Sequence, residues 1–175
     1  TAEQALAEIL MICKAKACKS IVKSKSMVTE EIHLNAFLQE NGIESIETDL
    51  GEYIQQLDGE APYHIVTPAM HKSKEDIAKL FSEKLGTDSK LNPQQLTRVA
   101  RNILREKFTQ AEIGITGANF LISDMGAIAI TENEGNARSS CAWPPVHIAI
   151  VGIEKMIPSF SDLGLFWPLL STFGA

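Results

Sequence analysis

Apolar helical stripes alternate with short apolar runs over the first two thirds of the sequence, and this alternation constrains the fold most strongly. The clearest stripe, over residues 96–104, repeats every three or four positions, as one face of an α-helix requires. Runs over residues 19–23, 43–48 and 63–67 are typical of short strands. Strands that alternate with helices favour a parallel sheet with helical crossovers.

Local signals predict where three of the helices begin. Thr29 is predicted as an N-cap because two glutamates follow it, and the first turn of a helix favours acidic groups. Ser73 with Asp76 has the pattern of a capping box. Asn92 followed by Pro93 places a cap before a proline at the first helical position.

After residue 112 the apolar pattern changes from helix-like to strand-like. Short strands are predicted over residues 113–116, 120–123, 127–131 and 147–151. The turn Asp124-Met125-Gly126 between two of them predicts a tight antiparallel hairpin. We therefore expect one α/β domain over residues 1–175, with a mostly parallel sheet, helical crossovers and an antiparallel hairpin edge.

Charge, hydropathy and cysteine spacing exclude several classes of protein. The net charge of −6 argues against a nucleic-acid surface. No apolar run approaches the roughly 20 residues that a membrane-spanning helix needs. Cys13, Cys18 and Cys141 form no C-x-x-C pair, so we expect reduced thiols in a cytoplasmic protein and no metal site within this chain.

The loop over residues 24–28 is the first candidate for chemistry. Lys23, Lys25 and Ser26 stand between a predicted strand and the start of a helix, where free N–H groups and the helix dipole favour anions. Ligands of open α/β sheets also bind beyond the carboxyl ends of the strands. The same residues fit a solvated loop whose hydroxyl groups only cap the helix.

Polar residues gather after two of the later strands and beside a third. Asn119 follows the glycine-containing run GITGA and offers both a donor and an acceptor, although this run is no dinucleotide-binding fingerprint. Glu132 and Arg138 lie in a polar stretch whose arginine could grip a carboxylate with two hydrogen bonds. His147 could act as a general base at neutral pH. Each residue also fits an ordinary turn or strand end.

Five segments together resemble one known family. In chain order they read VKSKSMVTEEI, ETDLGEYIQQL, HIVTPAMHKS, GITGANFLISDMGAIAITENEGNAR and PPVHIAIVGIEKMIP. They are similar to the LUD domain of the lactate utilization protein B family, whose members are iron–sulfur subunits of L-lactate dehydrogenase complexes. The resemblance runs from about Val22 to Pro158. Ala137 departs from the family pattern where glycine is common, as do Ser139 and Trp143 where aliphatic residues are common.

The resemblance implies a fold similar to the sugar-phosphate isomerase and CoA-transferase group. It implies work in a multi-subunit cytoplasmic complex that oxidises L-lactate to pyruvate. Family members carry [4Fe–4S] clusters in a C-terminal cysteine-rich region, and this sequence has no such run. We therefore expect a fragment of a longer chain with no cofactor of its own, and no turnover in isolation.

Three hypotheses about function remain open at this point. In the first, a small carboxylate such as lactate binds a cation and polar donors, a base takes a proton, and other subunits accept the electrons. The candidate binding residues are Lys23, Lys25, Ser26, Asn119 and Arg138, and the candidate bases are His147 and Glu132. In the second, the chain is an isomerase or acyl-CoA transferase with Glu132 or Glu134 as nucleophile. In the third, it is a non-catalytic docking module.

Overall fold

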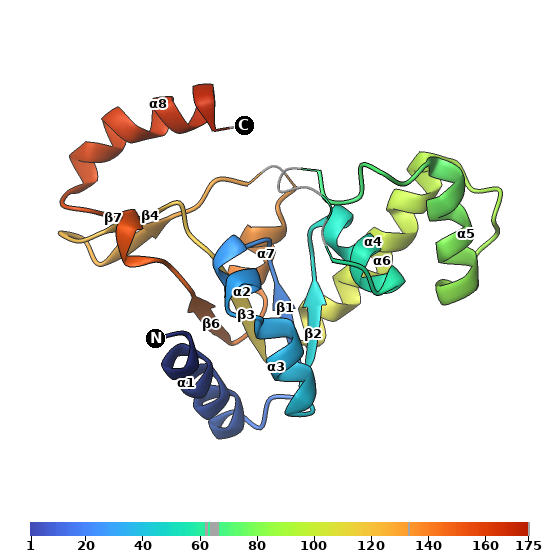
Figure 1. Cartoon of the computed structure of the whole chain (residues 1–175), viewed down its shortest axis with the longest axis horizontal. Helices are drawn as coiled ribbons and strands as arrows, with labels where there is room; N and C mark the ends of the chain where they lie inside the picture. Colours follow the sequence, from blue (N-terminus) through green and yellow to red (C-terminus); the bar gives the residue numbers. More distant parts are fainter. Residues whose placement is uncertain (62, 64–66, 133, 175) are drawn as a thin grey trace.

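Two sheets organise the structure, a computed structural model that describes residues 1–61, 63, 67–132 and 134–174 (Figure 1). The first sheet is parallel, with the order β2 (Glu44–Glu47), β1 (Ser20–Lys23), β3 (Ile113–Thr116) and β6 (Val146–Ala149). The second has the order β5 (Ala127–Ala129), β4 (Phe120–Ile122) and β7 (Met156–Ile157). The predicted α/β class, with its parallel sheet, helical crossovers and antiparallel hairpin, is confirmed. The hairpin β4–β5 lies in the second sheet.

The strand order places a change of direction at the centre of the parallel sheet. The chain leaves β1 for β2 on one side and later returns to β3 on the other side of β1. Connections that diverge in this way leave a crevice beyond the carboxyl ends of the two central strands. Lys23 ends β1 and Thr116 ends β3, so the residues that follow them reach this crevice.

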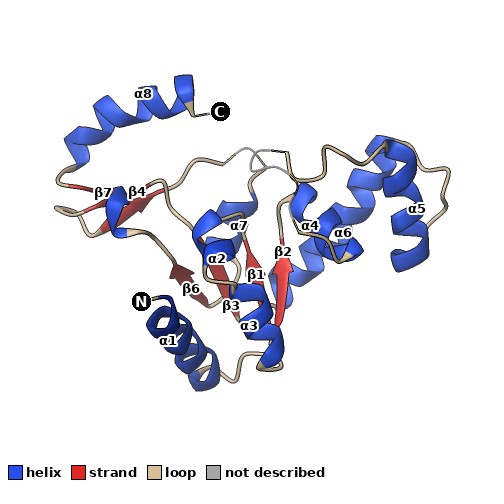
Figure 2. Ribbon diagram, in the orientation of Figure 1, coloured by secondary structure: helices blue, strands red, loops and turns tan. Residues whose placement is uncertain are grey.

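Helices cover both faces of the parallel sheet (Figure 2). On one face α1 (Ala2–Ala15) and α3 (Leu34–Glu40) pack over Ile21 and Ile113 in a buried cluster. On the other face α4 (Leu50–Asp58), α5 (Lys74–Leu85) and α6 (Pro93–Gln110) bury a cluster that includes Val22 and Ile46. Adjacent strand residues point to opposite faces, which is why Ile21 and Val22 belong to different clusters.

Two of the predicted helix starts are confirmed. Ser73 and Asp76 form a capping box at the start of α5, and Asn92 caps α6 with Pro93 at its first position. The prediction for Thr29 is wrong, because α2 (Met27–Glu31) begins at Met27 with Ser26 as its N-cap residue. The Thr29 hydroxyl lies inside the helix and donates to the carbonyl oxygen of Ser26 at 2.6 Å.

Three helices have no counterpart in the predictions, namely α4, α7 (Asn136–Ala142) and the C-terminal helix α8 (Leu163–Phe173). Helix α4 follows Asp49, whose carboxylate accepts hydrogen bonds from two N–H groups of its first turn. Helix α7 begins inside the stretch interpreted as a polar loop. Its composition is poor for a helix, so tertiary packing on β3 accounts for it better than propensity does. The strand predicted over residues 63–67 falls mostly outside the described residues.

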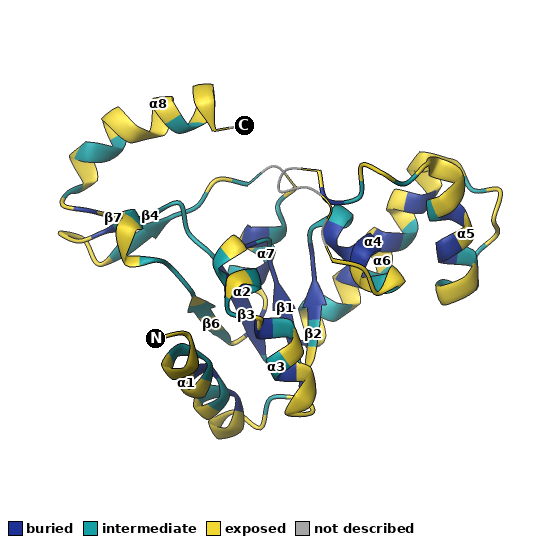
Figure 3. Ribbon diagram, in the orientation of Figure 1, coloured by how far each residue is buried: buried dark blue, intermediate teal, exposed yellow. Residues whose placement is uncertain are grey.

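The C-terminal helix α8 (Leu163–Phe173) has an unusual environment, since no residue in it is buried (Figure 3). Two of its aromatic rings, Phe166 and Trp167, lie 5.8 and 6.3 Å from the Phe120 ring of β4. Leu165, Leu169 and Phe173 remain exposed. Within the described part of the chain, every helix is too short or too polar to cross a bilayer.

Candidate functional site

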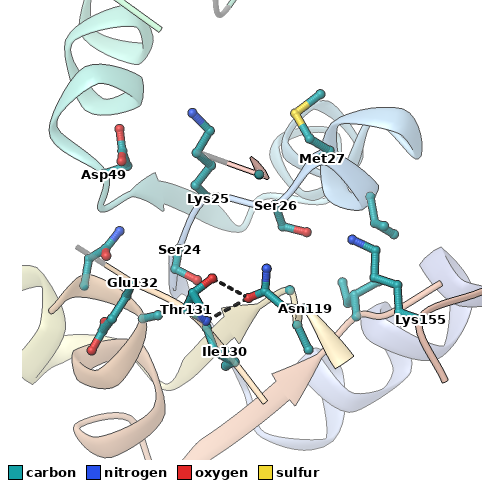
Figure 4. Close-up of a pocket in the computed structure, with 17 residues that line it drawn as sticks. Ser24, Lys25, Ser26, Met27, Asp49, Asn119, Ile130, Thr131, Glu132 and Lys155 are labelled. Carbon is teal, nitrogen blue, oxygen red and sulfur yellow. Dashed lines mark hydrogen bonds between the residues drawn. The ribbon is translucent and has the colours of Figure 1, made fainter. Parts of the chain in front are cut away.

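A cavity of about 360 Å³ lies at the carboxyl edge of the parallel sheet (Figure 4). Its walls come from the loop after β1, the turn after β3, the segment after β5 and the start of α7. Four of the predicted site residues lie in these walls, namely Lys25, Ser26, Asn119 and Glu132. The first two loops touch, because a methyl group added to Gly117 would lie 2.8 Å from the Ser26 hydroxyl oxygen.

Asn119 is held in one orientation by Thr131. Its Oδ1 accepts a hydrogen bond from the Thr131 N–H at 2.7 Å and another from the Thr131 hydroxyl at 2.9 Å. An amide with its oxygen occupied in this way directs its NH₂ group elsewhere. Figure 4 shows the nitrogen directed toward Ser26, so Asn119 offers the cavity a fixed hydrogen-bond donor.

Two lysines in the cavity wall supply positive charge. Lys25 Nζ lies 3.9 Å from Glu52 Oε1, and it is buried without a hydrogen bond to any described residue. Lys155, just before β7, directs its amine toward Ser26 (Figure 4), and the described residues give it no ion pair. Sequence reasoning missed Lys155 as a site residue. Only the packing of the second sheet brings it to the first, so its spacing in the sequence carried no signal.

The carboxylates in the cavity wall accept hydrogen bonds from backbone N–H groups in the first turns of helices. Asp49 Oδ1 accepts hydrogen bonds from the N–H groups of Gly51 and Glu52, at 3.0 and 3.2 Å. Glu132 Oε2 accepts from the Arg138 N–H at 2.9 Å, and its Oε1 lies 3.2 Å from Arg138 Nε. Both carboxylates already accept hydrogen bonds. Lys155 has no ion pair among the described residues and Lys25 has only the 3.9 Å contact with Glu52, so these two lysines are the charges left for an anionic ligand.

Lys23 lies behind the cavity and is fully buried. Its amine pairs with Glu30 at 2.5 Å and Glu47 at 2.7 Å, and donates to the Thr29 hydroxyl at 2.9 Å. Burial opposes the charge, but the two carboxylates outweigh burial and raise the pKa of Lys23 above its ordinary value. Lys23, at the end of β1, therefore links α2 to β2. Lys23 does not belong to the described cavity wall.

The two remaining predicted residues lie outside this cavity. Arg138 is 82% exposed and lies on the outer side of α7. His147, near the start of β6, has its Nε2 2.8 Å from the Thr116 hydroxyl and 3.5 Å from the Cys141 sulfur. Burial lowers the pKa of His147. The binding role of Arg138 and the catalytic roles of His147 and Glu132 stay predictions.

Glu52 lies beside Glu47 beneath the cavity. Burial, and after it the neighbouring Glu47 carboxylate, raises the pKa of Glu52 from 4.5 to about 8. Between these values the unfolded chain releases the proton while the folded protein keeps it, so the free energy of unfolding falls as the pH rises. Glu52→Gln has no proton to release, and we expect its stability relative to the wild type to rise from pH 5 to pH 8.

Urea unfolding of both proteins across this pH range measures the effect. Glu83→Gln is the matched control, because Glu83 is an exposed helical residue whose only described ion pair is with Lys79 at 3.9 Å. A stability difference between Glu52→Gln and the wild type that stays constant from pH 5 to pH 8 would contradict the raised pKa of Glu52.

The residues present do not fit an iron–sulfur cluster within this chain. A [4Fe–4S] cluster is held by four cysteine thiolates, and the sequence has three cysteines. Among the described residues, no three histidine, cysteine or acidic side chains gather as a metal site. The cysteines of this chain therefore cannot complete the ligand set of a [4Fe–4S] cluster by themselves.

The fold and the cavity define an α/β protein with a lysine-lined cavity at the switch point of its parallel sheet. Comparison with protein families matches residues 1–171 to the LUD domain. The chain belongs to the LUD domain family.

Curated relatives agree with this assignment. Lactate utilization protein B of Bacillus pumilus (strain SAFR-032) is 48% identical over 171 residues, and that of Bacillus subtilis (strain 168) is 48% identical over 172. An "Uncharacterized electron transport protein YkgF" of Escherichia coli (strain K12) is 44% identical over 171 residues. These alignments cover 97–98% of this chain but 36% of each relative, so the chain spans about a third of their length. No solved structure gives a significant match.

Proposed function

We propose that this chain is the ligand-binding domain of a cytoplasmic lactate-utilisation protein that takes part in the oxidation of L-lactate to pyruvate. The observation that carries the proposal is the convergence of Lys25, Ser26, Asn119 and Lys155 on one cavity at the sheet edge. The names of the curated relatives support the link to lactate utilisation.

The chemistry of the cavity suits a small hydroxy or keto acid. A lysine ammonium group neutralises the carboxylate, and the Asn119 NH₂ group with the Ser26 hydroxyl can bind the neighbouring oxygen. The volume of about 360 Å³ is at the small end of the range for ligand pockets. Oxidation of lactate also needs a base for the hydroxyl proton and an acceptor for two electrons.

The proposal places the electron acceptor outside this chain. The [4Fe–4S] clusters would be carried by other parts of the full-length protein, and further subunits would complete the complex. The exposed apolar side chains of α8 support a docking role, because contiguous apolar surface often marks a protein interface. The names of the relatives refer to lactate utilisation and electron transport, and the multi-subunit complex is part of the proposal.

Lys25→Ala and Lys155→Ala test the proposal. Each is expected to weaken the binding of pyruvate and L-lactate by about 1–3 kcal/mol, the usual range for loss of a charged hydrogen bond. Isothermal titration calorimetry with both acids measures this. Lys90→Ala is the matched control, because Lys90 is exposed and lies outside the cavity.

Two results would count against a carboxylate site at this cavity. One is no saturable binding of either acid at millimolar concentration. The other is equal weakening by Lys90→Ala, which would indicate a general charge effect. Acetate serves as a third ligand, because it has the carboxylate but lacks the hydroxyl or keto oxygen on the neighbouring carbon. Weaker binding of acetate would show that the site recognises this oxygen.

A further inference from the structure

A second, larger cavity lies between α6 and α7, on the side of the sheet away from α1. Its volume is about 840 Å³, within the usual range for binding sites of small organic molecules. Leu104 and Phe108 of α6 form part of an apolar wall, and Trp143 at the end of α7 forms another part. The mechanism proposed above uses none of these residues.

Positive charge collects around this cavity. Arg101 and Arg105 are four residues apart on α6, so their side chains lie on the same helix face. Neither guanidinium group has an ion pair or a hydrogen bond to a described residue. Arg138 of α7 contributes a third guanidinium group, which also forms an ion pair with Glu132. Glu134 is the one acidic residue of the described wall, and its Oε2 already accepts a hydrogen bond from the Leu50 N–H.

This cluster is unexpected in a protein whose net charge is −6. Arg101 and Arg105 are both exposed, and like charges four residues apart on a helix repel each other, which costs a small amount of free energy. An anion with several charged oxygens would remove the repulsion, since guanidinium groups bind phosphate oxygens with two parallel hydrogen bonds. The arrangement therefore favours a ligand with phosphate groups.

The aromatic side of the cavity also favours a ligand that contains a planar ring. Trp143 is 61% exposed although it lies on a cavity wall, so its indole face is available for contact. Nucleic-acid bases stack on such faces without strict sequence preference. Phe108 on α6 adds apolar surface to the same cavity.

We propose that the cavity between α6 and α7 is a nucleotide-binding site, with Trp143 stacking on the base and Arg101, Arg105 and Arg138 binding the phosphate groups. A nucleotide joins a planar heteroaromatic ring to several negative charges, and the cavity holds both kinds of partner. The proposal is independent of the carboxylate site, because the two cavities share only Asn136 among their described wall residues.

Tryptophan fluorescence of the 175-residue chain tests the site directly. The chain has two tryptophans, so Trp167→Phe leaves Trp143 as the single reporter. ATP and ADP are the probes, and tripolyphosphate and adenosine separate the contributions of phosphate and ring. We expect saturable quenching by ATP and ADP, with tripolyphosphate and adenosine each binding at least about tenfold more weakly than ATP.

Three variants locate the bound nucleotide. Arg101→Gln and Arg105→Gln are each expected to raise the dissociation constant of ATP by about tenfold, the effect of losing one charged hydrogen bond. Arg98→Gln is the matched control, because Arg98 is exposed on α6 but outside the described cavity wall. A thermal melt of each variant checks that it remains folded.

The proposal is overturned if millimolar ATP gives no saturable quenching, or if tripolyphosphate binds as tightly as ATP. It is also overturned if Arg98→Gln weakens binding as much as Arg101→Gln. If Lys25→Ala weakens ATP binding and the arginine variants do not, the nucleotide occupies the sheet-edge cavity and this assignment is wrong.

Discussion

Gly114→Ala is expected to destabilise the protein by about 3 kcal/mol, the upper end of the usual cost of overpacking a core. A methyl group at Gly114 would lie 1.8 Å from the carbonyl oxygen of Ser140 in α7. The blocking atom is backbone, so a change of side-chain conformation cannot relieve the overlap. Helix α7 would have to move away from β3, and the wall that it gives to both cavities would move with it.

Urea unfolding followed by far-ultraviolet circular dichroism measures this loss. Gly164→Ala is the matched control, because a methyl group at Gly164 of α8 meets no atom within 4 Å. Alanine is the better helix former, so the control is expected to be neutral or slightly stabilising. Equal stability of Gly114→Ala and the wild type would mean that α7 does not pack on β3 as described.

Lys23→Met is expected to cost about 3–5 kcal/mol of folding free energy, the range for removing one partner of a buried ion pair. The substitution keeps much of the side-chain volume but leaves the Glu47 carboxylate buried without its cation. The bond between β1 and the first turn of α2, made through Thr29, is lost as well. Chemical unfolding at neutral pH measures the difference.

A surface pair provides the control for Lys23→Met. Lys107 binds Glu44 at 2.9 Å, but both side chains are partly exposed, so Lys107→Met is expected to cost less than about 1 kcal/mol. The double variant Lys23→Met with Glu47→Met should recover part of the loss, since no unpaired charge remains at Glu47. If Lys23→Met costs no more than Lys107→Met, then Lys23 does not have the structural role assigned to it.

The parts of the fold that local patterns control were predictable. The capping box of Ser73 and Asp76 and the Asn92-Pro93 start of α6 depend on residues within three positions of each other, and both are confirmed. The strands at residues 20–23 and 113–116 have apolar residues at Ile21-Val22 and at Ile113 and Ile115, because the parallel sheet buries both of its faces.

Other features depend on side-chain and packing contacts made only in the folded structure, and these features were missed. Helix α7 has weak helix formers, and it is held by packing on β3 at Gly114. Threonine is a residue type that often caps helices, but the Thr29 hydroxyl accepts a hydrogen bond from the buried amine of Lys23. In both cases a contact made in the folded structure outweighs a local preference worth about 1 kcal/mol, with β3 for α7 and with Lys23 for Thr29.

The sequence by itself determined the α/β class, most of the strands and the family, because these follow from hydrophobic period, caps and long matching segments. It also indicated that Ser26 and Asn119 follow strands whose carboxyl ends meet at one edge. Only the tertiary structure decided that Lys23 is buried in an ion-pair network and that Lys155 faces the cavity. The position of a long side chain depends on which neighbours desolvate it or pair with it, and those neighbours are brought together only by folding.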